Sequence, residues 1–277
     1  MSMAARNRIF AALAIVVVGA KVAGLAGVAH ADEDEWPSIA RELYQDRKIA
    51  DAADKFALYV PAQAADAAIV PVSVRFPENT AVRVKSMTLV IDRNPAPVVA
   101  TFEFGNAFRD SVDVGERLIE TRVRVDSFSN LRAVVEMQDG SLHMASKFVA
   151  GAGGCSAPTG KDPEAALAGL GKVKIDVRRD QVRGKTWRDA RIMIKHPNFT
   201  GMQMDPMSGN YTPARFVETL EIKRGGELMM KVSGGISLSE NPHIRVTYGT
   251  DRDETIEVSG VDTLGSRFSG STGAGGS

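Results

Sequence analysis

A chain of 277 residues is long enough for two ordinary domains. Its 34 basic and 34 acidic residues cancel, and no dense run of Lys and Arg occurs, so the sequence does not indicate a basic surface for nucleic acid. One cysteine excludes an intrachain disulfide framework and any cysteine-rich zinc or iron–sulfur cluster.

Residues 1–31 have the layout of a secretory signal peptide. Arg6 and Arg8 give a positive start, an apolar run follows over 9–20, and Ala29-His30-Ala31 fits the small-x-small pattern of a cleavage site. The alternative is an uncleaved anchor, but the apolar run is shorter than the ~20 residues that span a bilayer. We therefore expect export to the periplasm and no membrane attachment after cleavage.

An amphipathic helix is expected at the start of the mature chain. Apolar residues recur at helical spacing at Trp36, Ile39, Ala40 and Leu43. Pro37 suits the first turn of such a helix. The same stripe could continue as far as Phe56, and its expected role is to pack against a sheet.

The apolar period then changes from 3.6 to 2, which is typical of half-buried strands. We expect strands over 70–76, 82–91, 98–104, 119–125, 131–137 and 142–148. Asp139-Gly140 is a typical hairpin turn between the last two. Short strands separated by turn signals predict an immunoglobulin-like antiparallel β-sandwich over residues 32–150.

Residues 151–171 interrupt this pattern and predict a linker between two domains. Its first half is rich in glycine, and its second half could form a short helix over 162–170, capped by Asp162 with Pro163 in the first turn.

Strands resume after the linker. They are expected around 192–194, 216–222, 228–232, 244–248 and 256–258. They predict a second, smaller sandwich over 172–269, followed by a disordered tail over 270–277. The expected fold class is all-β: two immunoglobulin-like antiparallel β-sandwiches, an N-terminal helix and a short interdomain helix.

Familiar catalytic motifs are missing from the sequence. It contains no Gly-x-Gly-x-x-Gly after a strand, no phosphate-binding-loop lysine and no Gly-x-Ser-x-Gly elbow. The histidines of the mature chain, His143, His196 and His243, lie far apart and lack metalloprotease spacing. We therefore expect a protein that is not an enzyme and that has no cofactor.

The single cysteine, Cys155, is the main candidate for a functional residue. It follows Gly153 and Gly154 in a stretch of small residues directly after the first predicted sandwich. Glycines give the backbone wide freedom, so we expect an exposed, mobile thiol with the two glycines as its hinge. The alternative is a linker cysteine without a role. An exposed thiol in an exported protein risks oxidation and dimerisation. We therefore favour a functional role for Cys155 over the alternative of a linker cysteine without a role.

The order of these parts resembles the SoxYZ sulfur-compound carrier family, with Y-like and Z-like halves fused in one chain. The Y-like half matches through the stretch 69–74 and Gly-Gly-Cys at 153–155. The Z-like half matches through 194–197, 211–217 and 239–242. More narrowly, the fused form resembles the SoxYZ-like carriers associated with periplasmic quinoprotein dehydrogenases.

The resemblance implies a role for Cys155 as covalent carrier of sulfur intermediates on which separate sulfur-oxidising enzymes act. It also implies redox partners such as a quinoprotein dehydrogenase or a c-type cytochrome. This chain departs from the family pattern after Cys155: the family arm usually reads Gly-Gly-Cys-Gly-Gly near a free C-terminus, whereas Ser156-Ala157-Pro158 and a whole domain follow here. A loop held at both ends has a shorter reach than a free arm.

Two other functions compete with the carrier hypothesis. The protein could be a non-catalytic docking partner of a periplasmic redox enzyme, in which case binding would not need Cys155. It could also handle copper, because Met202, Met204 and Met207 lie in one loop close to His196, and thioethers and imidazole suit Cu(I). The simpler interpretation is that these methionines cover the end of a sandwich or a domain interface.

Overall fold

The structure, a computed structural model, describes residues 34–110, 115–158, 163–180, 186–205 and 208–272. The expected signal peptide, residues 1–31, lies outside this part of the chain. No helix among the described residues is long and apolar enough to cross a membrane.

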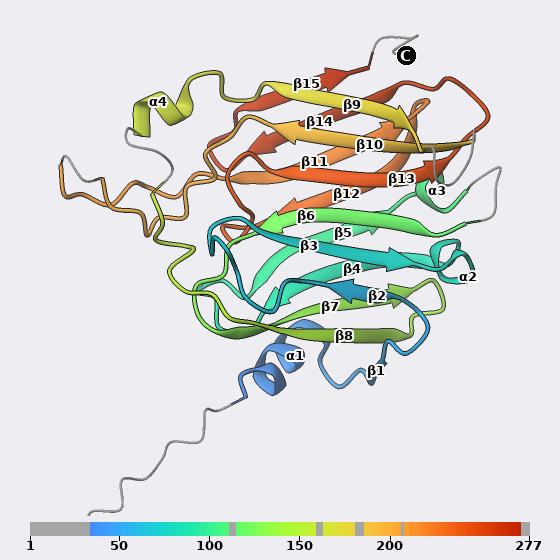
Figure 1. Ribbon diagram of the computed structural model, residues 1–277, viewed down its shortest axis with the longest axis horizontal. Coiled ribbons are helices and arrows are strands. Elements are labelled where there is room, and N and C mark those ends of the chain that lie inside the picture. The colour runs from blue at the N-terminus through green and yellow to red at the C-terminus, as the bar shows by residue number, and fades with distance from the viewer. Residues whose placement is uncertain (1–33, 111–114, 159–162, 181–185, 206–207, 273–277) are drawn as a thin grey trace, which may run out of the picture. The chain divides into compact units, whose positions relative to one another are not determined.

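Most of the described chain forms two β-sheets (Figure 1). The first has nine strands, in the order β1 (Ile49–Asp51), β8 (Leu142–Val149), β7 (Ser129–Met137), β4 (Val84–Ile91), β5 (Val98–Phe104), β12 (Glu227–Gly234), β11 (Val217–Arg224), β14 (Ile256–Asp262) and β15 (Arg267–Ser271). The second has six, in the order β2 (Ala57–Tyr59), β3 (Val70–Phe76), β6 (Arg117–Val123), β13 (His243–Gly249), β10 (Trp187–Ile194) and β9 (Val173–Arg179). Neighbouring strands are antiparallel, except that β1 runs parallel to β8. The expected all-β class with antiparallel sheets is confirmed.

Both sheets run without a break through the two halves of the chain. In the first sheet β5 pairs with β12, from Phe104 opposite Met230 to Ala100 opposite Gly234. In the second sheet β6 pairs with β13 at Glu120 opposite Arg245. An unpaired strand edge leaves backbone N–H and C=O groups without partners. Each half satisfies these groups with the edge of the other, so the two expected sandwiches form one continuous two-layer structure.

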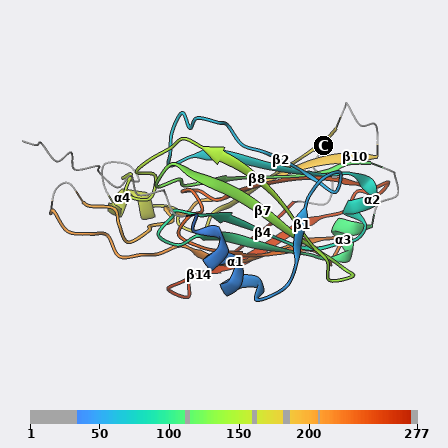
Figure 2. The same cartoon turned by 90° about the horizontal axis from the view of Figure 1, so that it is seen from below.

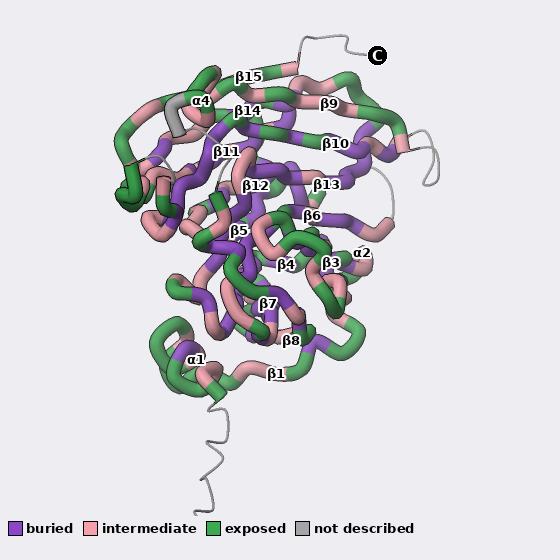
Figure 3. Tube along the Cα trace, turned by 60° about the vertical axis from the view of Figure 1, so that its left-hand side comes forward, coloured by how far each residue is buried: buried purple, intermediate pink, exposed green. Residues whose placement is uncertain are grey.

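Alternation along the strands places the core between the two sheets. In β3, Val70, Val72, Val74 and Phe76 are all buried, while the residues between them are more exposed. Figure 3 shows this buried layer running through the strands of both halves. Phe76 also packs edge-on against Phe108, which stacks on Phe104 at 4.3 Å between ring centroids. Burial of this kind contributes about 25 cal/mol per Å² of apolar surface.

The N-terminal helix α1 (Trp36–Tyr44) forms as predicted and buries Ile39. Its expected continuation to Phe56 is wrong: the chain turns at Gln45, where φ is 55°, and residues 49–51 form β1 instead. Arg132 holds the helix by stacking over the Trp36 ring at 4.6 Å. The same guanidinium forms a buried ion pair with Asp92, with its shortest N–O distance at 2.7 Å.

Three short helices lie at the ends of the strands. α2 (Glu78–Ala81) and α3 (Asn106–Arg109) are at one end, and α4 (Pro163–Leu167) is at the other (Figures 1 and 2). α4 is the expected interdomain helix, shorter than predicted, and its proposed cap Asp162 lies outside the described residues. The prediction of a disordered tail over 270–277 is wrong at its start, because Gly270 lies in β15 and pairs with Val258 of β14. Residues 273–277 lie outside the described part.

Candidate functional site

Cys155 lies in the segment that leaves β8 and leads toward α4, and its side chain is fully buried, with 0% exposure. The expectation of an exposed thiol is therefore wrong for this conformation. Figure 1 shows that this segment passes along the α4 end of the strands. The burial has to be explained by what the loop contacts, because its own residues are small.

The loop is bound to the chain that follows β6. The N–H of Gly153 donates to the carbonyl of Asp126 at 2.9 Å, and the N–H of Gly154 donates to that of Val125 at 3.0 Å. The N–H of Cys155 donates to the Asp126 carboxylate at 3.1 Å. Three consecutive backbone donors are thus satisfied by two neighbouring residues, which fixes the course of the loop.

The two glycines are needed by this docked geometry. Gly153 has φ at +74°, a region that glycine enters without the steric cost of a side chain. Gly154 lies so close to its neighbours that a Cβ atom would overlap the carbonyl oxygen of Ala67 and come within 2.6 Å of that of Val125. Glycine at 154 therefore allows close packing, a role that its flexibility alone did not indicate.

A loop from the second half of the chain closes over the cysteine. The Thr200 hydroxyl donates to the carbonyl of Cys155 at 2.6 Å, and the Gln203 side-chain amide donates to the carbonyl of Ala157 at 3.2 Å. Gln203 in turn accepts the backbone N–H of Thr200 at 2.8 Å. Sequence reasoning missed both residues, because they lie more than forty positions from Cys155 and belong to no motif.

Burial changes the chemistry of the thiol. It raises the pKa of Cys155 to about 12, because loss of water disfavours the thiolate, and the nearby Asp126 carboxylate acts in the same direction. The Arg124 guanidinium opposes both effects without overcoming them. The thiolate is the nucleophilic form, so the docked cysteine is protected from reaction at neutral pH.

Arg124 is a charged residue of the site that sequence reasoning missed. In the strand predicted over 119–125 it occupies one of the alternate polar positions, which were expected to face solvent, yet it is only 1% exposed. Its Nη1 donates to the carbonyl of Gly154 at 3.0 Å, directly beside Cys155. Its Nε and Nη2 have no hydrogen-bond partner among the described residues. Burial lowers the pKa of this guanidinium.

The weak copper candidates Met202, Met204, Met207 and His196 have different surroundings where the structure describes them. His196 is completely buried; its Nδ1 accepts the backbone N–H of Asn198 at 3.0 Å, and its Nε2 lies 3.5 Å from the Asp262 carboxylate. Burial lowers the pKa of His196. Met204, in contrast, is 51% exposed, and Met207 lies outside the described residues. Within the described part of the chain, His, Cys, Asp and Glu form no cluster suited to a metal ion.

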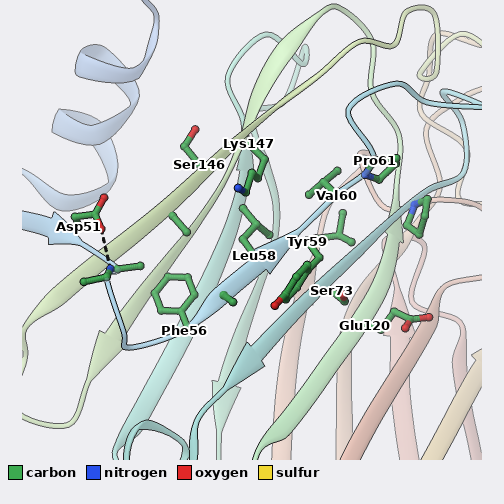
Figure 4. A pocket seen from close by; sticks show the side chains of 16 residues that line it. Asp51, Phe56, Leu58, Tyr59, Val60, Pro61, Ser73, Glu120, Ser146 and Lys147 are labelled. Carbon is green, nitrogen blue, oxygen red and sulfur yellow. Dashed lines mark hydrogen bonds between the residues drawn. The ribbon is translucent and has the colours of Figure 1, made fainter.

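A surface cleft of about 800 Å³ lies elsewhere, between β2 and β8. Figure 4 shows Leu58 and Tyr59 of β2 along it, with Lys147 of β8 and Glu120 of β6 at its sides. Tyr59 is half exposed. The Cys155 loop does not line this cleft, so the cleft and the cysteine are separate features.

Two family models divide the chain between them. The model described as sulfur oxidation protein SoxY matches residues 40–155, and the one described as sulphur oxidation protein SoxZ matches residues 177–273. The chain belongs to the SoxYZ family of sulfur-oxidation carriers. The SoxY match ends at Cys155 itself, and in this SoxYZ-like chain both partners of the family are joined in one polypeptide.

Two solved structures show distant similarity to the chain. The sulfur carrier protein SoxY from Chlorobium limicola f thiosulfatophilum is 19% identical, covering 42% of this SoxYZ-like chain and 91% of that protein, with a TM-score of 0.34. The CupB2 chaperone of Pseudomonas aeruginosa is 12% identical, covering 83% and 98% of the two chains, with a TM-score of 0.21. No curated protein sequence matches the chain.

Proposed function

We propose that the protein is a periplasmic carrier that binds sulfur-compound intermediates covalently through Cys155 and presents them to sulfur-oxidising enzymes. It carries out no catalysis of its own and needs no cofactor besides the sulfur adduct. The observation that supports the role most directly is that the SoxY match ends on the only cysteine of the chain. Residues 1–31 direct export, which places the thiol among periplasmic enzymes.

The carrier role requires the loop to leave its docked position. Opening breaks the hydrogen bonds that Thr200 and Gln203 donate to the loop and those that Gly153, Gly154 and Cys155 donate to Val125 and Asp126. Gly153 and Gly154 then act as the hinge, with residues 151–171 as the linker between a SoxY-like domain, 32–150, and a SoxZ-like domain, 172–269.

The covalent tether limits the reach of the thiol. Cys155 lies six residues beyond the last residue of β8, Val149. At ~3.5 Å per extended residue, the thiol reaches roughly 20 Å from the end of that strand. A partner must therefore bring its active site to the α4 end of the strands, instead of taking up a long free arm.

A second function is favoured by the burial of Cys155. A chain whose one thiol is inaccessible could instead serve as a docking partner of a quinoprotein dehydrogenase or c-type cytochrome. The cleft beside Tyr59 would then be the feature to probe, and binding would survive Cys155→Ala.

The deciding experiment is intact-protein mass spectrometry on the mature chain purified from its native periplasm without reductant. The carrier proposal expects added mass of whole sulfur atoms or a sulfonate on Cys155, removed by reductant and absent from Cys155→Ala. A plain thiol mass, obtained while the host is oxidising sulfur compounds, would exclude the carrier role and favour the docking role.

A further inference from the structure

The side chain of Arg124 presents buried hydrogen-bond donors beside Cys155 for which the described residues offer no acceptor. Nη1 contacts the Gly154 carbonyl at 3.0 Å, while Nε and Nη2 are buried without a partner among the described residues. Buried polar groups are hydrogen-bonded in the great majority of cases, and an unpaired buried charge is costly. A guanidinium in this condition is suited to an anion, which it can bind through two parallel N–H groups.

The position of Arg124 is fixed by its backbone. Its N–H donates to the carbonyl of Ser237 at 2.8 Å, and its carbonyl accepts the Asn94 amide at 2.7 Å. Asn94 is itself buried and also accepts the N–H of Asp126 at 2.9 Å. The guanidinium is therefore held against the Gly154–Cys155 peptide by strand and side-chain contacts from both halves of the chain.

Other charges near Arg124 do not occupy its two donors. Glu240 and Asp66 act on its pKa only through space. Asp126, the nearest carboxylate to the thiol, accepts the Cys155 N–H. The Asp126 carboxylate disfavours negative charge at the sulfur, and the Arg124 guanidinium favours it.

We propose that Arg124 is the anion-binding residue of the Cys155 site and holds the negatively charged end of a sulfur compound attached to the cysteine. The ligand class is an S-linked sulfonate, –S–S–SO₃⁻. This inference rests on the proposed carrier function and adds to it: the docked loop stores the loaded cysteine, and it does so selectively for anionic cargo. A neutral adduct of similar length is not stabilised by the Arg124 charge.

The test compares one anionic and one neutral adduct on the full mature chain. With tetrathionate, the Cys155 thiolate attacks a central sulfur, the central S–S bond breaks, thiosulfate leaves with the electron pair, and Cys155–S–S–SO₃⁻ remains. With methyl methanethiosulfonate, the thiolate attacks the sulfenyl sulfur, methanesulfinate leaves, and Cys155–S–S–CH₃ remains. In both reactions the thiol proton passes to buffer.

The readout is the rate at which a phosphine removes each adduct, divided by the rate for the same adduct in denaturant. This ratio cancels the intrinsic reactivity of the two disulfides. In the wild type we expect the anionic adduct to be at least about tenfold better protected than the neutral one, which corresponds to about 1.4 kcal/mol. In Arg124→Gln that difference should vanish, and Arg124→Lys should keep part of it.

Arg122→Gln is the matched control. It removes the same charge two residues earlier in the chain, from an exposed side chain, and should protect both adducts as the wild type does. Equal protection of the two adducts in the wild type would overturn the proposal, and this comparison holds even if the Arg124 variants do not fold. So would a folded Arg124→Gln that protects the anionic adduct as well as the wild type does.

The carrier role of Cys155 and the anion site at Arg124 can be rejected independently. A native chain without sulfur adducts, combined with Arg124-dependent protection of the synthetic adduct, would reject the carrier role and leave the anion site standing. A native adduct combined with protection that does not depend on Arg124 would reject the anion site and keep the carrier.

Discussion

Replacing Thr200 by Val should make Cys155 reactive without unfolding the protein. The Thr200 hydroxyl donates to the buried carbonyl of Cys155 at 2.6 Å and accepts the N–H of Met202 at 3.1 Å. Valine has a similar shape but leaves both groups without that partner. In the open loop water hydrates the Cys155 carbonyl, so the substitution penalises the docked state more than the open one.

The size of the effect follows from the cost of an unpaired buried group. That cost is about 1–3 kcal/mol, which raises the open population about 5- to 150-fold. In the docked state burial raises the pKa of the Cys155 thiol from its ordinary 9.0 to about 12, so the thiolate fraction at pH 8 is lowered about a thousandfold. Alkylation therefore proceeds through the open state, and its rate should rise in proportion to the open population.

The assay is the rate of iodoacetamide labelling at pH 8, followed by intact mass in native buffer and in urea. Wild type should label at least about a hundredfold more slowly than the denatured chain, and Thr200→Val should label about 5- to 150-fold faster than wild type. Ser208→Ala is the control, since Ser208 lies on the same loop but is exposed, and its hydroxyl donates to the Asp205 carboxylate at 2.8 Å. Wild-type labelling at the denatured rate, or no change in Thr200→Val, would refute the reasoning.

Three further predictions concern the fold around the site. Gly154→Ala should expose the thiol to iodoacetamide, because its Cβ would overlap the docked backbone. Gly140→Ala is the control: it lies at a turn with φ +84° and open space, so it should cost about 1–2 kcal/mol and leave labelling unchanged. Burial lowers the pKa of His196 and His243, so the unfolded chain binds protons more readily than the folded one as pH falls below 6.5. The free energy of unfolding, measured in urea, should therefore decrease from pH 7 to 5. If His243→Gln left the slope of stability against pH unchanged, that would contradict the prediction for His243. Asp92→Asn should cost roughly 3–5 kcal/mol in the same assay, because it removes the carboxylate of a buried ion pair with Arg132. A cost below 1 kcal/mol would contradict that.

The strands were predictable from the sequence where the two faces differ in polarity. β3 and β5 follow the expected ranges because their inward positions are apolar in strict alternation. β9 carried a comparable signal at Val173, Ile175 and Val177 that was not assigned. β15 carried almost none, since it contains only one large apolar residue, Phe268. The joining of the halves was not predictable either, because backbone pairing between edges is nearly independent of side-chain identity.

The sequence indicated which loop to consider as the candidate site, but it did not indicate that the loop is docked. The loop was singled out by a lone cysteine among glycines, and glycine has two opposite uses: it permits motion, and it permits close approach. The sequence shows only the residue type, and the second use depends on where Ala67 and Val125 lie in space. Thr200 and Arg124 carry no motif, so their contacts with the loop needed the fold.

The proposed export and carrier role place a single thiol in an oxidising compartment, and the burial of Cys155 is compatible with that role. An accessible thiolate in an oxidising compartment is lost to side reactions, whereas the docked loop keeps the sulfur protonated and out of reach. The protection also lowers the apparent affinity of any partner that needs the open loop, in proportion to the fraction that is open. Thr200→Val should therefore shift the balance: it should load and deliver cargo faster with a partner enzyme present, and lose cargo faster to a phosphine when the partner is absent. A variant that changed one rate and left the other unaltered would mean that the loop does not govern access to Cys155.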